Sequence, residues 1–120
     1  MPSLSDALRE RLSSYSEIHI SVTGRKSRRI VSIPVWFVLD GDNLYLLPVQ
    51  GSDTQWYKNV LNDPLVSVEV RGAEGELKVV PITKASEVAS VVAKFRTKYG
   101  ANDVKKYYSK LDVAVLAQAR

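Results

Sequence analysis

The sequence predicts a mainly β (α+β) fold, a six-stranded antiparallel barrel with helices packed outside. Three observations lead to this prediction. Short valine-rich segments alternate apolar and polar residues, turn sequences join two pairs of these segments, and segments with helical apolar spacing lie between them. A chain of 120 residues has the size of one domain with a single core, so we expect one domain over residues 1–120.

The first half of the chain predicts one helix and three strands. A four-residue spacing of leucines indicates the helix, and alternating apolar residues indicate each strand. In order, these elements are a helix with Leu4, Leu8 and Leu12 on one face and strands over residues 18–23, 31–39 and 44–49. Turn residues at 40–43 join the last two strands as a hairpin. Because Pro34 has no backbone N–H, its strand should be an edge strand or be bulged there.

The second half predicts three helical segments and three strands. Four-residue apolar pairs, capping residues and a terminating proline or glycine indicate the helices. In order, these elements are a helix from Ser52 to about residue 62, strands over 66–71 and 77–82, helical segments over 88–99 and 104–111, and a strand over 112–117. Ser52 is the expected cap of its helix because Gln55 follows at capping-box spacing, and Asn102 is the expected cap of the last helix.

Composition and charge limit the classes of site. No cysteine is present, which excludes disulfides, thiolate metal sites and a catalytic thiol. The single histidine, His19, cannot form a histidine metal cluster and is expected to have a structural or solvent-facing role, so we predict no metal site. The start of the chain does not read as a signal peptide and no stretch is long enough to cross a bilayer, so we expect a cytoplasmic protein. A net charge of +4 permits a nucleic acid, a membrane surface or a phosphorylated ligand as partner.

A basic segment over residues 23–29 is the most informative candidate for a binding site. It places four cations, one glycine and two hydroxyl groups in a loop between two strands. Such a loop can hold a phosphate or a short string of carboxylates, and it can equally be a solvated hairpin turn. It is not a P-loop, because it lacks the spaced glycines and the Gly-Lys-Ser/Thr ending.

Two aromatic clusters are further candidates. Trp56 follows Ser52 at a predicted helix start, where free N–H groups attract anions and an indole can form a platform for a flat ring. The alternative is that Trp56 fills the core. The second cluster is Tyr99, Tyr107 and Tyr108. These phenols can stack on a ring or donate a proton, or they can be core residues. No nucleophile or general base accompanies either cluster, which points to chemistry supplied by a cofactor.

Several motifs follow one another in a recognisable order over residues 18–72. They are Thr23-Gly24-Arg25-Lys26-Ser27, Pro34, Asp40-Gly41, Trp56-Tyr57-x-Asn59 and Asn62-Asp63-Pro64-x-Val66. In order and spacing they resemble the deazaflavin-dependent nitroreductase family. That family belongs to the flavin and deazaflavin oxidoreductases with a pyridoxamine-phosphate-oxidase-like split barrel. The resemblance implies that the predicted barrel is a split β-barrel.

The resemblance also implies a coenzyme site. The coenzyme-binding residues would be Arg25, Lys26, Ser27, Arg29, Gln50, Gly51, Ser52 and Trp56. The first four would grip the phosphate and acidic tail of 8-hydroxy-5-deazaflavin (coenzyme F-420), and the others would line its ring and phosphate region. The chain departs from the family at Val49-Gln50, where members often carry Ser-Lys, and in a shorter basic loop.

We therefore predict an oxidoreductase that transfers hydride from the reduced deazaflavin to a quinone, enone or nitro compound, with Tyr107 or Tyr108 as proton donor. One alternative keeps the fold and binds FMN, whose single phosphate needs fewer basic contacts. Another is a small basic barrel that binds single-stranded nucleic acid, but only Trp36 and Tyr45 clearly alternate outward on strands, so we expect no nucleic-acid partner. A further alternative is a module that stores or senses a cofactor without turnover. In the family the coenzyme often lies at or near a subunit contact, and an edge strand needs covering, so a homodimer is expected.

Overall fold

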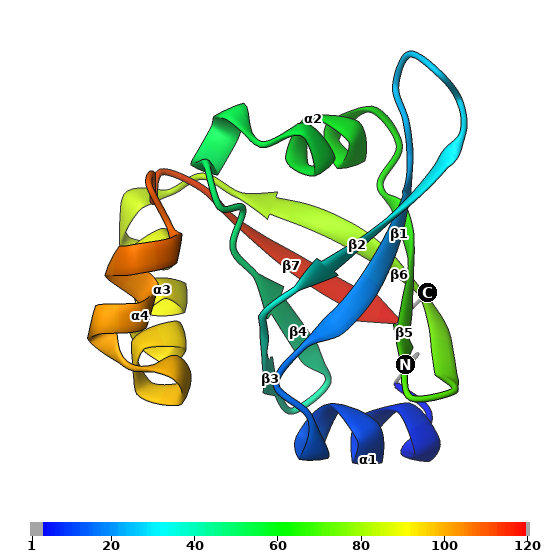
Figure 1. The fold of residues 1–120 in the computed structure, drawn as a ribbon, viewed down its shortest axis with the longest axis horizontal. Coiled ribbons are helices and arrows are strands. Elements are labelled where there is room, and N and C mark those ends of the chain that lie inside the picture. The colour runs from blue at the N-terminus through cyan, green and yellow to red at the C-terminus, as the bar shows by residue number, and fades with distance from the viewer. Residues whose placement is uncertain (1–3, 120) are drawn as a thin grey trace.

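The computed structural model describes residues 4–119, which form one curled antiparallel sheet of seven strands with four α-helices around it (Figure 1). The strands are β1 (Ile18–Thr23), β2 (Ile30–Val35), β3 (Phe37–Asp40), β4 (Asn43–Leu46), β5 (Leu65–Val70), β6 (Ala73–Ile82) and β7 (Ala114–Ala119). The helices are α1 (Asp6–Ser14), α2 (Gln55–Asn62), α3 (Ala85–Tyr99) and α4 (Ala101–Tyr107), and a 3-10 turn η1 spans Gly51–Asp53. The strand order is β2-β1-β5-β6-β7-β4-β3. The predicted α+β class and antiparallel sheet are confirmed.

The sheet has seven strands and not the predicted six, because the second predicted strand is divided at Trp36. β2 ends at Val35, β3 begins at Phe37, and the two strands lie at opposite edges of the sheet. Trp36 alone connects one edge to the other, so the sheet curls until its edges are joined through this residue. Pro34 lies in the edge strand β2, as predicted for a residue without an N–H.

One face of the curled sheet forms the main core. In β1, Ile18, Ile20 and Val22 are buried, whereas His19 between them is exposed. Strands β3 to β7 contribute fully buried side chains in the same way, among them Phe37, Leu44, Leu46, Val68 and Leu77, whereas the edge strand β2 has no buried side chain. Alternation with a period of two therefore removes one face of these strands from water. The solvent-facing alternative expected for His19 is confirmed.

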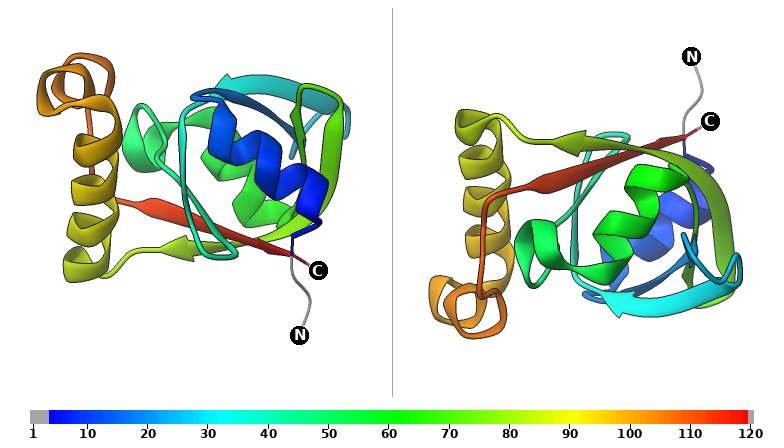
Figure 2. Two further views of the ribbon diagram at one scale, coloured as in Figure 1. Left: turned by 90° about the horizontal axis from the view of Figure 1, so that it is seen from below. Right: turned by 90° about the horizontal axis from the view of Figure 1, so that it is seen from above.

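Helices α1 and α2 lie across the two open ends of the curled sheet (Figure 2). Leu8 and Leu12 of α1 are buried in the main core, which confirms the predicted helix. The predicted cap of α2 at Ser52 is wrong, since Ser52 lies inside η1 and the N-cap residue is Thr54. The Thr54 hydroxyl does not cap the helix but accepts a hydrogen bond from the Gln50 N–H (2.8 Å).

Helices α3 and α4 pack beside the sheet and form a second core. Phe95 is fully buried there, with Trp36 and Tyr45 partly buried against it. Gly100, with φ +96°, ends α3 as predicted and is also the N-cap residue of α4. The predicted cap at Asn102 is wrong, because that residue already lies within α4. None of the helices within residues 4–119 is long and apolar enough to cross a membrane.

Candidate functional site

A cavity of about 400 Å³ lies beside the edge strand β2. Its wall comes from β2, from the segment after β4, from α2 and from the end of α4. Four aromatic side chains line it: Trp36, Trp56, Tyr107 and Tyr108. Among the described residues in the wall, Glu17 is the one that carries a charge. A mostly apolar cavity of this size with few polar groups is typical of a site for a small organic ligand.

Three of the predicted site residues meet in this cavity. Trp56 is 3% exposed, lines the cavity and also belongs to the main core, so its position is compatible with both alternatives that the sequence left open. Tyr108 is 8% exposed, whereas Tyr107 is half exposed. The structure thus places the predicted ring platform and the two predicted proton donors around one space.

Trp36 is the aromatic wall residue that sequence reasoning did not assign to the site. Its ring stacks on Tyr99, with centroids 4.3 Å apart and planes 9° apart, and meets Tyr107 edge-on at 5.4 Å. The sequence signal was a large aromatic residue alternating outward on a strand. The sequence did not show that α3 and α4 would cover that face of the sheet.

Burial changes the acidity of two tyrosines near the cavity. Burial raises the pKa of Tyr99 to about 12, with a smaller contribution from the charge of Glu17. Burial also raises the pKa of Tyr108, and Tyr99 adds to that effect. Both phenols therefore keep their protons at neutral pH. The Tyr99 hydroxyl donates its proton toward the carbonyls of Ser16 and Phe37.

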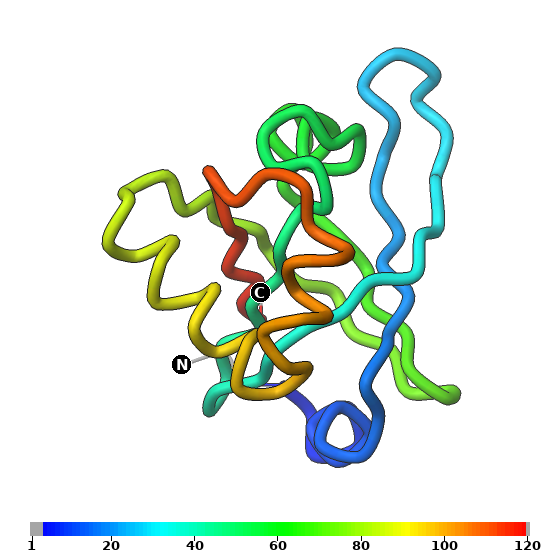
Figure 3. Tube along the Cα trace, turned by 60° about the vertical axis from the view of Figure 1, so that its left-hand side comes forward, coloured from blue at the N-terminus to red at the C-terminus, as the bar shows by residue number. Residues whose placement is uncertain are grey.

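The predicted basic loop connects β1 to β2 and stands out from the sheet (Figure 3). The Gly24 N–H donates to the Arg29 carbonyl (2.8 Å), the Arg28 N–H donates to the Gly24 carbonyl (3.0 Å), and the Ser27 hydroxyl accepts from the Arg29 N–H (3.2 Å). Arg28 has φ +61°, a left-handed conformation that costs a non-glycine residue about 1–2 kcal/mol. The loop is thus held in one shape by its own hydrogen bonds.

Helix α2 links this basic loop to the cavity. The Arg25 guanidinium donates to the side-chain oxygens of Asn59 (2.8 Å) and Gln55 (2.9 Å), and Gln55 directly precedes Trp56. Both partners are neutral amides, so the charge of Arg25 is not neutralised. The exposed side chains of three further cations form no ion pair with any described residue: Lys26, Arg28 and Arg29. The structure therefore presents uncompensated positive charge next to the helix that walls the cavity.

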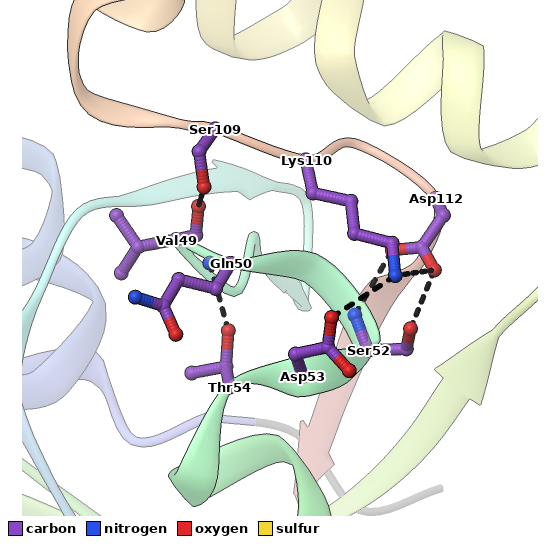
Figure 4. A network of polar contacts seen from close by, with 8 residues as sticks. All are labelled: Val49, Gln50, Ser52, Asp53, Thr54, Ser109, Lys110 and Asp112. Atoms are coloured by element: carbon purple, nitrogen blue, oxygen red, sulfur yellow. Dashed lines mark hydrogen bonds and ion pairs between the residues drawn. The ribbon is translucent and has the colours of Figure 1, made fainter.

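The other predicted coenzyme contacts, Gln50, Gly51 and Ser52, do not line the cavity, although Val49 directly before them does. They lie beside a polar network that includes Val49, Gln50 and Ser52 (Figure 4). The N–H and hydroxyl of Ser52 both donate to the Asp112 carboxylate (2.9 and 2.6 Å). The Lys110 ammonium lies 3.2 Å from an Asp53 oxygen and 3.7 Å from an Asp112 oxygen. The donors of Ser52 are therefore already used within the protein, and the network ties η1 to the segment that follows Tyr108.

The family model of DUF2255, described as "Uncharacterized protein conserved in bacteria", matches residues 9–117. The chain belongs to this family. No curated protein matches it in sequence.

Solved structures with the same fold include proteins of different activities. An F420-H2 dependent reductase, FDR-A, is 18% identical with a TM-score of 0.68, covering 86% of this chain and 94% of its own. The heme storage protein HutZ from Vibrio cholerae is 14% identical with a TM-score of 0.72, covering 98% and 91%. A protein from Listeria innocua proposed to be a pyridoxamine 5'-phosphate oxidase is 12% identical with a TM-score of 0.69, covering 95% and 90%. At these identities the likeness shows the fold alone.

In this DUF2255 chain, Gly51→Ala is expected to lower the free energy of unfolding more than Gly41→Ala. Both glycines have left-handed φ, +56° and +64°, which costs alanine about 1–2 kcal/mol. At Gly51 a Cβ would also collide with the Asp112 carboxylate and lie 3.0 Å from the Lys110 carbonyl, whereas nothing lies within 4 Å at Gly41. Urea unfolding of both variants measures the difference. Equal losses would show that the network does not require a glycine at this position.

The Asp112 network is also expected to make stability depend on acid pH. Hydrogen bonds from the hydroxyl and N–H of Ser52, with the nearby Lys110 charge, hold the pKa of Asp112 below its ordinary value of 3.8. Ionised Asp112 therefore stabilises the folded state above pH 3.8. This contribution is lost as the pH falls through the pKa of Asp112 in the folded protein, which lies below 3.8.

Melting curves of the parent and Asp112→Asn test this dependence. The parent should melt at the higher temperature at neutral pH, and the difference should narrow below pH 3.8. Glu74→Gln, at an exposed carboxylate on β6, is the matched control and should match the parent throughout. A difference in melting temperature between the parent and Asp112→Asn that stays constant with pH would contradict the stabilising role of ionised Asp112.

Proposed function

We propose that this protein is an oxidoreductase that binds a flavin-type coenzyme, foremost 8-hydroxy-5-deazaflavin (coenzyme F-420), and reduces a small acceptor such as a quinone, an enone or a nitro compound. One observation carries the proposal: α2 joins an aromatic cavity at Trp56 to an uncompensated basic loop at Arg25. An aromatic cavity and a basic loop held together complement a flat ring that carries an anionic tail. The fold shared with an F420-H2 dependent reductase supports this class.

The cavity fits a flat ring in chemistry and in size. Trp36, Trp56 and Tyr108 provide apolar walls with few competing polar groups, and the volume of about 400 Å³ lies in the range of small-ligand sites. When bound, the reduced coenzyme would supply hydride from its ring. The part of this chain is to hold the ring, orient it and keep water from its buried side.

The basic loop fits the tail in charge and distance. The strand β2 runs from the loop to the cavity, and the four residue steps from Ile30 to Pro34 span roughly 13 Å. Lys26 and Arg29 would contact the tail, with Ser27 and Arg25 holding the loop in shape. A phosphate with further carboxylates offers these cations more partners than a single phosphate, which favours the deazaflavin over FMN. Gln50, Gly51 and Ser52 would support the site through the Asp112 network.

Tyr107 is the proposed proton donor to the reduced acceptor. It lines the cavity and is half exposed, so water can return its proton after each turnover. Tyr108 holds its proton more tightly because burial raises its pKa, and we assign it the role of a hydrogen-bond donor in the cavity.

Heme is the ligand against which this proposal is to be tested, since HutZ has the same fold. His19, the single histidine of the sequence, lies on the exposed face of β1 and does not line the cavity. Among the described wall residues, only the tyrosines and Glu17 have side-chain oxygens that could coordinate a heme iron. The carboxylate of Glu17 would also repel the carboxylates of heme. The cavity chemistry therefore favours a flavin-type ring.

Titration of the apo-protein with the deazaflavin, FMN and heme, followed by quenching of tryptophan fluorescence, tests the proposal. We expect the deazaflavin to bind most tightly and heme least. FMN binding that equals or exceeds that of the deazaflavin would assign the FMN alternative, and tightest binding of heme would reject the oxidoreductase. A single-stranded oligonucleotide should not bind, because Trp36 and Tyr45, the two aromatic residues that alternate outward on predicted strands, are partly buried against the second core and not fully exposed.

A homodimer is expected because the outer edge of β2 has no partner strand within residues 4–119. Two apolar side chains are also exposed on this strand, Ile30 (69%) and Val31 (40%). A second chain that covers this edge would shield the unpaired backbone of β2 and its exposed apolar side chains from water. Light scattering should give about twice the 13.4 kDa mass of one chain, and a single-chain mass at high protein concentration would reject the dimer.

A further inference from the structure

The hydroxyl of Tyr99 joins two other segments of the chain beside the cavity. It accepts a hydrogen bond from the Phe37 N–H (3.0 Å), and its single proton is shared between the carbonyls of Ser16 (2.7 Å) and Phe37 (2.8 Å). The neighbouring Lys98 ammonium donates to the same Phe37 carbonyl (2.8 Å) and lies 3.5 Å from the centre of the Phe37 ring. The end of α3 thereby fixes the backbone at the first residue of β3.

Trp36, directly before Phe37, is the residue that these contacts hold in place. It belongs to neither β2 nor β3, so strand pairing does not fix its orientation. Its indole is instead held by rings, stacked on Tyr99 at 4.3 Å and met edge-on by Tyr107 at 5.4 Å. Trp36 lines the cavity and Tyr99 does not.

We propose that Tyr99 is a positioning residue that sets the orientation of Trp36 and, through it, the shape of the aromatic wall that receives the flat ring. The ligand in this statement rests on the proposed function, whereas the placement of Trp36 by Tyr99 does not. The tyrosine contributes in two separable ways. Its ring supports one face of the indole, and its hydroxyl fixes the backbone next to the indole.

Three variants separate these contributions. Tyr99→Phe keeps the stacked ring and removes every hydrogen bond of the hydroxyl, whereas Tyr99→Leu removes both. Lys98→Met is the comparison variant at the same end of α3, for the second side chain that donates to the Phe37 carbonyl. It removes the bond from the ammonium to the Phe37 carbonyl but leaves Tyr99 and its stacking on Trp36 intact.

Fluorine NMR of protein labelled with 5-fluorotryptophan follows the indoles directly. The chain has two tryptophans, so two resonances are expected, which Trp36→Phe and Trp56→Phe assign. Tyr99→Phe should shift or broaden the Trp36 resonance and leave that of Trp56 in place. Lys98→Met removes one contact to Phe37 and none to the indole, so it should change the Trp36 resonance less than Tyr99→Phe does. A sharp Trp56 resonance shows that a variant is folded. If Tyr99→Leu does not fold, Tyr99→Phe alone tests whether Tyr99 sets the orientation of Trp36.

Ligand titration of the same samples connects the placement of Trp36 to binding. Tyr99→Phe should weaken binding of the deazaflavin by about threefold to tenfold. An unchanged Trp36 resonance in both Tyr99 variants, or a shifted resonance with unchanged affinity, would overturn the proposal. A shifted Trp36 resonance in a protein whose parent binds neither the deazaflavin nor FMN would support the placement of Trp36 by Tyr99 and would reject the proposed function instead.

Discussion

Trp56→Ala is expected to lower the free energy of unfolding by about 3–5 kcal/mol. The indole is 3% exposed and packs in the main core, so its removal leaves a void that the surrounding strands can fill only in part. The same side chain lines the cavity, so binding of a ring ligand should fall together with stability. Urea unfolding measures the first effect, and titration of the protein that remains folded measures the second.

Two further variants separate the core role of Trp56 from its role in the cavity. Trp56→Phe keeps much of the buried volume and should cost less stability than alanine. Tyr107→Ala removes another aromatic wall residue that is half exposed, so it should change stability little while still affecting the cavity. An alanine variant at Trp56 as stable as the parent would show that the indole is not part of the core.

Lys26→Ala and Arg29→Ala are each expected to weaken coenzyme binding by roughly tenfold to a hundredfold. A hydrogen bond between charged groups contributes about 1.5–3 kcal/mol, and about 1.4 kcal/mol is a factor of ten in affinity. The stability of the apo-protein should hardly change, because both side chains are exposed and form no ion pair with a described residue. Fluorescence titration and a thermal melt of each variant measure the two quantities.

Control experiments distinguish specific contacts of Lys26 and Arg29 to the coenzyme tail from a general electrostatic attraction by the positively charged protein. Lys84→Ala removes an exposed cation before α3 and should bind as the parent does. Added salt should weaken the parent complex more than the Lys26 and Arg29 variants, because each variant has lost a screened contact. The titrations are repeated with an oligonucleotide, since a nucleic-acid site would show the same salt trend. If both variants bind the deazaflavin and FMN as the parent does, the loop is only a solvated turn.

Local sequence patterns predicted most of the secondary structure, and the errors came from contacts between distant residues. The alternation over residues 31–39 is continuous, so nothing local indicates the break at Trp36, which arises where the two edges of the sheet meet. Ser52 has the local chemistry of a helix cap. Asp112, which is 60 residues away in the sequence, takes both of its donors.

The candidate site was predictable in its parts but not in its assembly. The density of charge in the basic loop and the aromatic residues Trp56, Tyr107 and Tyr108 were visible in the sequence. Their connection depends on the hydrogen bond from Arg25 to Asn59 across 34 residues and on the packing of α4 against the sheet. Such long-range contacts leave no periodic signal.

The most direct test of the central claim compares the deazaflavin with its tail and the same ring without phosphate or carboxylates, both titrated into the parent. If the aromatic cavity holds the ring and the basic loop holds the tail, the ring alone should bind and the tail should strengthen binding by about tenfold or more. That gain should shrink in Lys26→Ala and Arg29→Ala. Equal affinity for the two ligands in the parent, or no binding of either, would contradict the account.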